Sequence, residues 1–543
     1  MRPSRPRGAE AGRLLVTAAL LLAAACAAAA AGADVHKAAV GAGGAWAALP
    51  LSFHAGAPPP RQRGARSLLR ARKSEVRGSV NGGYYSATLL VGTPPQAFDL
   101  VLDTGSSTTQ MTCATCTSCG RHKQRRYNHR ASATAVPVPC GGATCAAAPN
   151  KFSCDAGRCA YKEAYKEGSS TQGWLVRDVV SLPGSKGASG TTDVGCVEKE
   201  TGYIYEQEAD GIMGLGNAAR ALPFQLARSG NVSSMFALCF AFPHGGVLTF
   251  GDAPLPPNTG PLSWTPLQPS PAHYYTLAMQ GIDLSSEVDS TPAFEFVGLG
   301  MDITRVPAGR LVGFRELPVS SRDFSVGYGT VLDSGANFNY LPSRALAELV
   351  KALEAEMNAK GRKMWTGGVM NDHCWLIDEA PADSPEAWAA VYRLFPVLRL
   401  RFASGAALLL PPRRYLFALS NQDFCLGFFD NASDGAIIGG ISVRDMLMIY
   451  DLERQQIGMA EADCGKMEAL GGAIGGGGGG RPATGGAGAQ GGPSGAGGGP
   501  VLVSGRTGLP QPAVGQPAAA RAPPAAPPAS PPPGAPRARG RTG

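Results

Sequence analysis

Two short segments of this 543-residue chain share one pattern, in which an apolar, β-rich stretch ends in an aspartate. The first segment is FDLVLDTGSS, which contains Asp103, and the second is YGTVLDSGAN, which contains Asp333. In each copy a small hydroxyl residue and then a glycine follow the aspartate. Two such copies related by a pseudo-twofold axis would hold one ionised and one protonated carboxyl side by side. That pair would suit the hydrolysis of an amide bond by an activated water molecule.

The residues downstream of each aspartate also repeat. The segment ADGIMGLG, residues 209–216, follows the first aspartate, and AIIGGISVRDMLMIYD, residues 436–451, follows the second. An apolar pair followed by glycine would let a strand pass closely behind each aspartate loop. The same parts therefore occur twice in the same order, which predicts two similar lobes.

The elements that position these loops are predicted to be mainly β-strands. Short runs of β-branched and aromatic residues, bounded by Gly, Pro or Asn, indicate closely spaced antiparallel strands. Such runs occupy residues 84–92, 245–251, 274–284 and 447–460. One helix is also predicted after Pro342, with Ser343 as its cap. Its apolar face would consist of Leu346, Leu349, Val350, Leu353 and Met357.

Charge is distributed unevenly, although the formal net charge is +8. Residues 81–464 contain 30 Lys/Arg and 37 Asp/Glu, whereas both flanks are basic. The basic total is therefore no argument for a nucleic-acid partner, and none is expected. The length exceeds what one core usually serves. We expect an N-terminal lobe over residues 83–268 and a C-terminal lobe over 269–464.

The N-terminus predicts export. Four arginines precede an apolar run, residues 14–31, that ends in small residues. This pattern is typical of a secretory signal peptide, here residues 1–33. The alternative is an uncleaved anchor, which would attach the chain to a membrane. Both interpretations place the chain in the secretory pathway, in the ER or Golgi lumen, a vacuole or the extracellular space.

The two flanking segments lack the apolar residues of a folded core. Residues 34–82 are rich in Ala, Gly and Pro and then strongly basic. They are interpreted either as a linker or as a pro-segment whose cations cover an acidic cleft until removal. Residues 465–543 are rich in Gly, Pro and Ala and are predicted to be a disordered tail.

The cysteines predict disulfides. Cys26 lies in the signal peptide, and the even number that remains favours disulfides in an oxidising lumen. The spacing of the first three with His122 is also compatible with zinc, but disulfides are favoured, with His122 as an ordinary surface residue. Asn231 and Asn431 begin glycosylation sequons. The twelve cysteines are Cys113, Cys116, Cys119, Cys140, Cys145, Cys154, Cys159, Cys196, Cys239, Cys374, Cys425 and Cys464. Cys374 and Cys425 form a plausible pair.

The segment GYYSATLLVGTPPQAFDLVLDTGSS, residues 83–107, resembles the entry strand and first catalytic loop of the pepsin-like aspartic proteases. The resemblance covers nearly all of residues 83–464. It implies a mainly β, bilobal acid-protease fold with a few short helices and a central cleft. It further implies a monomeric endopeptidase that acts on polypeptides, is sensitive to pepstatin-like inhibitors, and needs no cofactor or metal.

The resemblance also assigns roles within the two loops. Asp103 and Asp333 would be the catalytic pair, and Thr104 and Ser334 would hydrogen-bond across the lobes. Both loops would need their glycines, Gly105 and Gly335, for a tight backbone.

The residue three after each aspartate usually offers its carboxylate a hydroxyl in this family. Ser106 fits, but Ala336 cannot donate. Because loss of a donor raises a carboxyl's pKa, the sequence predicts activity at milder acidity than that of pepsin.

The segment AYKEGSSTQGWLVRDVV, residues 164–180, resembles the family's flap, a β-hairpin that closes over substrate. Tyr165 would be the flap tyrosine, with Gly168 at the turn. Glu167 would either contact a basic substrate side chain or be a solvated turn residue. Gln110 replaces the tryptophan that supports the flap in pepsin, so the support must differ.

The cysteine-rich segment after the first aspartate resembles the insert of the nepenthesin type. With the flap sequence it resembles plasmepsin V most, which implies a luminal processing protease that reads a basic residue upstream of the cut. Lys166 departs from that pattern, because plasmepsin V has cysteine there. The tail also departs from it, since it is rich in Gly and Pro and is no membrane anchor. The rival hypothesis is a binding protein on the same fold, of the plant xylanase inhibitor kind, with little or no catalytic activity.

Overall fold

The computed structural model describes residues 47–54 and 83–465, except 147–150, 184–188, 231, 243–244, 254, 256–258, 271, 286–312, 368–371, 380 and 383. All of them lie in the first of the two units, Met1–Gly478 and Gly479–Gly543, into which the chain divides. The predicted signal peptide, most of the basic segment, Asn231 and the tail beyond residue 465 lie outside the described residues. Among the helices that are described, none has the length and apolar character to span a membrane.

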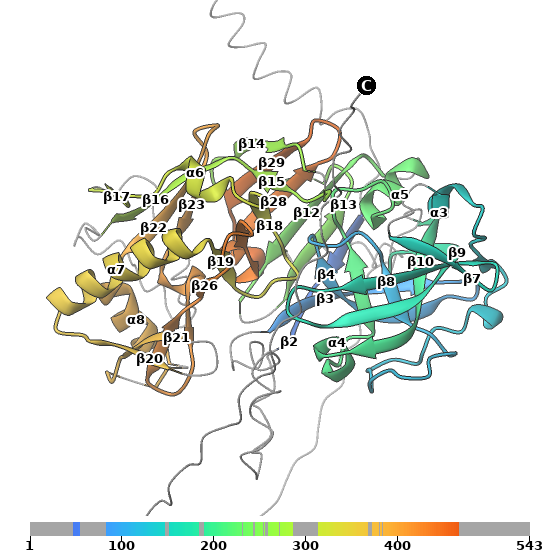
Figure 1. The fold of residues 1–543 in the computed structure, drawn as a ribbon, viewed down its shortest axis with the longest axis horizontal. Coiled ribbons are helices and arrows are strands. Elements are labelled where there is room, and N and C mark those ends of the chain that lie inside the picture. The colour runs from blue at the N-terminus through green and yellow to red at the C-terminus, as the bar shows by residue number, and fades with distance from the viewer. Residues whose placement is uncertain are drawn as a thin grey trace, which may run out of the picture. The chain divides into compact units, whose positions relative to one another are not determined.

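The described chain is mainly β and has two β-rich lobes, which confirms the predicted fold class (Figure 1). The N-terminal lobe contains a ten-stranded sheet in the order β2-β3-β4-β11-β5-β10-β9-β8-β7, with β6 beside β9. Its strands are β2 (Ser52–His54), β3 (Tyr84–Val91), β4 (Gln96–Asp103), β5 (Gln110–Thr112), β6 (Val136–Pro137), β7 (Phe152–Asp155), β8 (Arg158–Ala164), β9 (Ser170–Ser181), β10 (Ser189–Thr201) and β11 (Gly211–Gly214).

An eleven-stranded sheet joins the two halves of the chain, because β12 pairs with β28 over most of its length. The order is β1-β13-β12-β28-β29-β14-β15-β18-β27-β19-β26. The strands are β1 (Ala47–Pro50), β12 (Met235–Phe240), β13 (Gly246–Phe250), β14 (Ser263–Gln268), β15 (Thr276–Leu277), β18 (Thr330–Leu332), β19 (Asn339–Leu341), β26 (Phe428–Asp430), β27 (Ala436–Ile438), β28 (Met446–Asp451) and β29 (Gln456–Glu461).

Two four-stranded sheets and most of the helices complete the C-terminal lobe. One sheet consists of β17 (Arg315–Glu316), β16 (Met279–Ser285), β22 (Val397–Phe402) and β23 (Ala407–Leu410). The other consists of β20 (Met364–Gly367), β21 (Asp372–Leu376), β25 (Asp423–Leu426) and β24 (Leu416–Ala418). The helices of the described chain are α3 (Ala143–Ala146), α4 (Tyr203–Glu206), α5 (Leu222–Arg228), α6 (Ser321–Phe324), α7 (Ser343–Ala359) and α8 (Pro385–Leu394), with 3-10 turns η2 (His129–Ala131), η3 (Pro412–Arg414) and η4 (Gly440–Val443).

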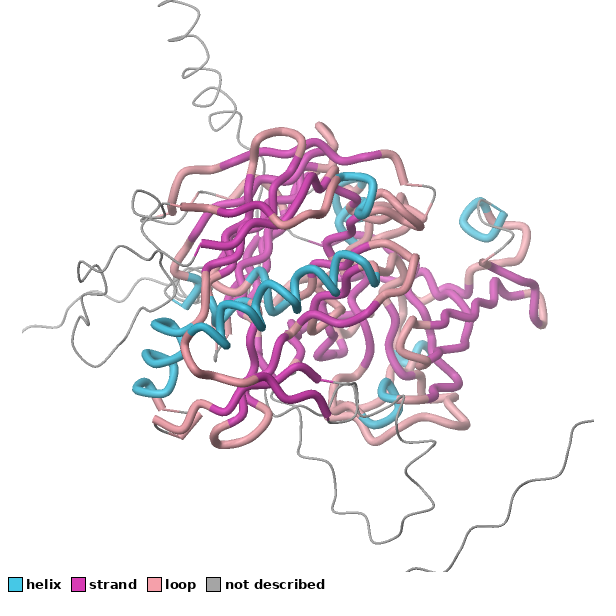
Figure 2. Tube along the Cα trace, turned by 60° about the vertical axis from the view of Figure 1, so that its left-hand side comes forward, coloured by secondary structure: helices cyan, strands magenta, loops and turns pink. Residues whose placement is uncertain are grey.

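Helix α7 is the helix that the apolar spacing predicts (Figure 2). It buries Leu346, Leu349, Leu353 and Met357 as expected. The predicted cap is wrong, because Pro342 occupies the N-cap and Ser343 is already helical. Its hydroxyl instead donates to the Asp430 carboxylate at 2.7 Å, which fixes the start of the helix against β26.

Residues 47–54 are not a linker, which corrects part of the interpretation of residues 34–82. They form β1, which pairs antiparallel with β13, and β2, which pairs antiparallel with β3. Leu49 and Leu51 are buried in the main hydrophobic core. The segment was missed because its two short strands have no pattern of their own. They gain their hydrogen bonds from edges that the body of the protein provides.

All twelve cysteines other than Cys26 form disulfides, as predicted. The pairs are Cys113–Cys196, Cys116–Cys119, Cys140–Cys154, Cys145–Cys159, Cys239–Cys464 and Cys374–Cys425. The plausible pair Cys374–Cys425 is thereby confirmed. Cys113, Cys116 and Cys119, which the alternative interpretation assigned to zinc with His122, are therefore all in disulfides.

Candidate active site

Each aspartate lies at the end of one strand with a second strand parallel to it. Strand β4 ends at Asp103, and Gly214 of β11 lies opposite that residue. Strand β18 ends one residue before Asp333, and Ile438 of β27 lies opposite Leu332. The predicted strand behind each aspartate loop is therefore present in both lobes.

The two loops bind each other through a symmetric set of hydrogen bonds. The Thr104 N–H donates to Ser334 Oγ at 3.0 Å, and the Ser334 N–H donates to Thr104 Oγ1 at 2.9 Å. The two hydroxyls donate in turn to carbonyls of the opposite loop, Thr104 to Leu332 at 3.1 Å and Ser334 to Leu102 at 2.9 Å. These bonds confirm the predicted contact between the lobes and fix the aspartates relative to each other.

The glycines of the loops let the carboxyls approach. A Cβ on Gly105 would lie 2.6 Å from a carboxylate oxygen of Asp333, and one on Gly335 would lie 2.5 Å from a carboxylate oxygen of Asp103. Both distances are below any real contact of a Cβ, so a larger residue would push the aspartates apart. The two carboxyls hydrogen-bond to each other, and Asp103 is only 6% exposed.

The surroundings of the pair favour one shared proton. Burial raises the pKa of Asp103, although the Ser106 hydroxyl and the Gly105 N–H act to lower it. Burial and the negative charge of Asp103 raise the pKa of Asp333 to about 8. Two close carboxyls cannot both ionise cheaply. The two carboxyls therefore titrate as one unit that holds a single shared proton, and the raised pKa of Asp333 favours that residue as its site.

The side chains three residues after the two aspartates differ. Asp103 accepts the Gly105 N–H at 2.8 Å. The Ser106 hydroxyl is buried close enough to lower the pKa of Asp103, although no described hydrogen bond involves its oxygen. Asp333 accepts the Gly335 N–H at 2.9 Å and the backbone N–H of Ala336 at 3.3 Å. No side-chain hydroxyl in the second loop replaces the donor that Ala336 lacks among the described hydrogen bonds of Asp333.

The side-chain amide of Gln110 supports Tyr165, the predicted flap tyrosine. Gln110 Nε2 donates to the Tyr165 hydroxyl at 2.6 Å. The Gln110 Oε1 atom accepts the hydroxyls of Tyr161 at 2.9 Å and Thr171 at 2.8 Å, so the fully buried amide is fixed on both sides. The expected difference from pepsin is thus confirmed, and Gln110 itself provides the support.

A further carboxyl, Glu163, lies beneath the flap and was missed by the sequence analysis. It accepts the Thr108 hydroxyl at 2.7 Å and the Tyr165 hydroxyl at 3.4 Å. Burial raises its pKa, and the charge of Asp103 adds to that effect. A lone glutamate in a strand gives no signal in a sequence. Only the fold brings it to the first catalytic loop.

The tip of the flap lies between β8 and β9. Gly168 takes a φ of 99°, a left-handed conformation that suits glycine. Glu167 is half-buried, so it is not a fully solvated turn residue. Burial is the main cause that raises the pKa of Asp103, and the negative charge of Glu167 adds to the rise.

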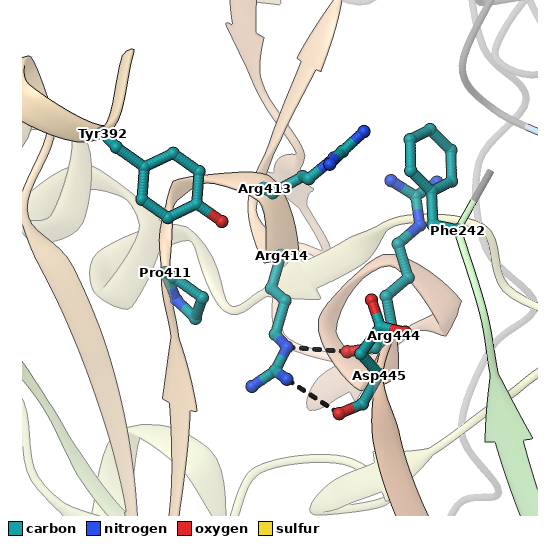
Figure 3. Close-up of a pocket in the computed structure, with 7 residues that line it drawn as sticks. All are labelled: Phe242, Tyr392, Pro411, Arg413, Arg414, Arg444 and Asp445. Atoms are coloured by element: carbon teal, nitrogen blue, oxygen red, sulfur yellow. Dashed lines mark hydrogen bonds between the residues drawn. The ribbon is translucent and has the colours of Figure 1, made fainter. Parts of the chain in front are cut away.

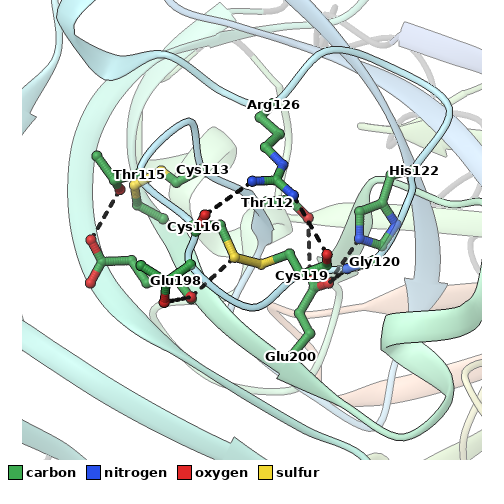
Figure 4. Close-up of a disulfide and its surroundings, with 12 residues drawn as sticks. Thr112, Cys113, Thr115, Cys116, Cys119, Gly120, His122, Arg126, Glu198 and Glu200 are labelled. Carbon is green, nitrogen blue, oxygen red and sulfur yellow. Dashed lines mark hydrogen bonds and ion pairs between the residues drawn. A yellow bond between two sulfur atoms is a disulfide. The ribbon is translucent and has the colours of Figure 1, made fainter.

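The prediction that His122 is an ordinary surface residue is wrong (Figure 4). Its side chain is 3% exposed and pairs with the Glu200 carboxylate at 2.8 Å. Glu200 also accepts the Thr112 hydroxyl at 2.8 Å and the Gly120 N–H at 3.1 Å. Burial acts to lower the pKa of His122, but Glu200 and nearby carbonyls together raise it. The pair attaches the cysteine-rich insert to β10.

Asn431 is an unsuitable glycosylation site in this structure. It is 3% exposed. Its Nδ2 atom, to which a glycan would attach, donates to the Tyr328 hydroxyl and the Gly435 carbonyl, both at 2.6 Å. A glycan would replace one of these two N–H donors and would have to fit into a buried site, so we do not propose this modification at Asn431.

A small arginine-lined cavity shares no lining residue with the aspartate loops or the flap (Figure 3). Arg414 donates from its guanidinium to the carbonyls of Arg444 at 2.7 Å and Asp445 at 2.9 Å. These bonds hold the backbone just before β28, which indicates a structural role. The lining residues are Phe242, Tyr392, Pro411, Arg413, Arg414, Arg444 and Asp445.

Comparisons with known proteins agree with this geometry. Family models described as Xylanase inhibitor N-terminal and Xylanase inhibitor C-terminal match residues 85–252 and 310–461, which together are more than half of the chain. Aspartic proteinase 36 of Arabidopsis thaliana is 25% identical over 70% of this chain and 74% of the relative. Aspartyl protease AED1 of the same plant is 28% identical, with 74% and 76% covered. Aspartic proteinase nepenthesin-1 of Nepenthes gracilis is 27% identical, with 74% and 85% covered. The chain therefore belongs to the pepsin-like aspartic protease family.

Proposed function

We propose that this chain is an aspartic endopeptidase that hydrolyses peptide bonds with a water molecule activated between Asp103 and Asp333. The observation that carries the proposal is the pair itself, two hydrogen-bonded carboxyls with raised pKa values. The symmetric bonds of Thr104 and Ser334 support it, because they fix the pair without any substrate.

The ionised Asp103 would take a proton from the water as the water attacks the scissile carbonyl carbon. The protonated Asp333 would donate a hydrogen bond to the carbonyl oxygen and stabilise the charge that develops there. Tyr165, held by Gln110, would align the peptide when the flap closes. As the tetrahedral intermediate collapses, the proton that Asp103 took from the water would pass to the leaving nitrogen. The C–N bond would then break to give one product with a carboxyl group and one with a free amine.

The substrate would be a polypeptide in the secretory pathway, which is compatible with six disulfides. The plant relatives are named as aspartic proteinases, which fits a proteolytic role, and we propose that this role is processing or degradation in the secretory lumen. We further propose that the half-buried Glu167, two residues after Tyr165, favours a basic residue upstream of the cut.

A binding or inhibitor protein is the second candidate, because the matching family models are described as xylanase inhibitors. In that case the cleft and disulfides would serve recognition rather than turnover. Both aspartates, both loop glycines and the flap tyrosine are nevertheless present, which favours the enzyme.

The experiment that tests the proposal is hydrolysis of a mixed fluorogenic peptide library by the secreted full chain from pH 3 to 8. The full chain is used because residues 47–54 are part of the fold. We expect cleavage that pepstatin inhibits and that Asp103→Asn lowers by about 10²–10⁴-fold in kcat. A folded, disulfide-bonded sample with no cleavage in this range would contradict the enzyme and favour the binding protein.

A further inference from the structure

The tip of the flap contacts the opposite lobe through one side chain. Lys166 follows the flap tyrosine, and its ammonium donates to Asn431 Oδ1, to the Asp434 carboxylate at 3.0 Å and to the Tyr328 hydroxyl at 3.4 Å. The ammonium also lies 5.5 Å from the centre of the Tyr328 ring. The flap belongs to the N-terminal lobe, whereas these three partners belong to the C-terminal lobe. Lys166 therefore bridges the two lobes.

The three partners of Lys166 are also held by hydrogen bonds within the C-terminal lobe that do not involve the lysine. Asn431 Nδ2 is bound by the Tyr328 hydroxyl and the Gly435 carbonyl, so its Oδ1 atom is turned toward the flap. The Tyr328 N–H donates to the Asp434 carbonyl at 3.0 Å, which joins the ring to the carboxylate-bearing turn. Tyr328 lies just upstream of β18, the strand that leads into Asp333, and Asn431 and Asp434 lie in the turn between β26 and β27.

The bridge is suited to repeated opening. The side chains of Lys166 and Asp434 are 48% and 61% exposed, and exposed ion pairs contribute little. The tyrosine beside Lys166 is held to its own lobe by the buried Gln110. One side of the flap tip is thus fixed to the N-terminal lobe, and the other makes a weak, charge-dependent contact with the C-terminal lobe.

We propose that Lys166 is a positioning residue that closes the flap over the cleft by bridging Asp434, Asn431 and Tyr328. This inference rests on the proposed function, because the bridge would serve to hold a bound peptide under the flap. A substrate enters when the bridge breaks, and the bridge forms again over it. Lys166 touches none of the reacting atoms, so its loss weakens the hold on substrate and leaves the chemical step in place.

The test compares Lys166→Met, which keeps the apolar stem and removes the charge, with Lys162→Met as the matched control. Lys162 is exposed on β8 of the same hairpin. We expect Lys166→Met to raise KM for a library-derived peptide by about two- to fivefold with kcat nearly unchanged. We expect hydrogen–deuterium exchange of residues 164–170 to be faster by a similar factor. The control should change neither quantity.

Charge exchange separates the bridge from a general effect of mutation. Lys166→Glu and Asp434→Lys each place like charges together, whereas the double variant restores an opposite pair. A return of KM and of the hydrogen–deuterium exchange rate toward the wild-type values in the double variant would support the bridge. Unchanged exchange in Lys166→Met, or no recovery in the double variant, would overturn it. If the wild type cleaves no peptide, the proposed function fails, but the exchange measurements still decide whether the bridge exists.

Discussion

Asp103 and Asp333 differ in the side chain that stands three residues after each carboxyl. The Ser106 hydroxyl is buried beside Asp103 and acts to lower its pKa, whereas Ala336 offers Asp333 only its backbone N–H. Burial and the charge of Asp103 raise the pKa of Asp333, and the N–H groups of Gly335 and Ala336 lower it only in part. Because a donor favours the ionised form of a carboxylate, a hydroxyl at position 336 would offset more of that rise.

We predict that Ala336→Ser moves the alkaline limb of kcat/KM to lower pH. A hydroxyl donated to the Asp333 carboxylate would lower its pKa by about one unit, and the protonated form needed for activity would be lost sooner. The measurement is the pH profile of kcat/KM for one peptide from pH 3 to 8. An alkaline limb that stays in place, or moves to higher pH, would contradict the role assigned to Ala336.

Residues within the two loops could be predicted from the sequence because the pattern is local and occurs twice. Thr104 and Ser334 follow their aspartates directly, so their contact follows from bringing the copies together. Glu163 and the partner of His122 could not be predicted in this way. Their hydrogen bonds join residues that lie 55 and 78 positions apart in the chain, and no repeated pattern marks either side.

At the scale of elements, the strands with apolar runs and the helix α7 could be predicted. The short strands that pair with edges of the folded body could not. Strand β13 and the hairpin of β28 and β29 have apolar runs long enough to recognise. Strands β1 and β2 contain only four and three residues and lie in an Ala- and Pro-rich stretch. Their pairing depends on the free edges of β13 and β3, which are known only once the body has folded.

We predict that residues 47–54 contribute measurably to stability. Leu51 is 3% exposed in the main core, and its N–H donates to the Gly246 carbonyl at 3.0 Å. Leu51→Ala should lower the free energy of unfolding by about 2–5 kcal/mol. Ser52→Ala, at an exposed neighbouring position, should change it by less than about 0.5 kcal/mol. Denaturant unfolding of the full chain measures both, and equal stabilities would show that this segment does not remain packed.

At the scale of the whole molecule, pH acts on folding through the same groups that would act in catalysis. The pKa of Asp333 is raised to about 8 by burial and by Asp103, so the folded chain holds a proton that the unfolded chain releases near pH 4. A group with a raised pKa stabilises the fold below its unfolded pKa, and that stabilisation declines as pH rises toward the folded pKa. The catalytic pair therefore favours a folded state at acidic pH.

We predict that the stability difference between wild type and Asp333→Asn changes steadily from pH 5 to pH 8. Wild type should lose stability relative to the variant by up to about 1.4 kcal/mol per pH unit, because asparagine binds no proton.

The matched control is Asp323→Asn. Although burial opposes ionisation of Asp323, Arg344 and Ser320 lower its pKa, so its contribution is complete above about pH 4 and is lost only below that. The difference between wild type and Asp323→Asn should therefore be constant from pH 5 to pH 8. Denaturant midpoints at each pH measure both differences. A flat difference for Asp333→Asn would show that the pair does not hold its proton in the folded chain, and the assignment of Asp333 as the protonated member would then be wrong.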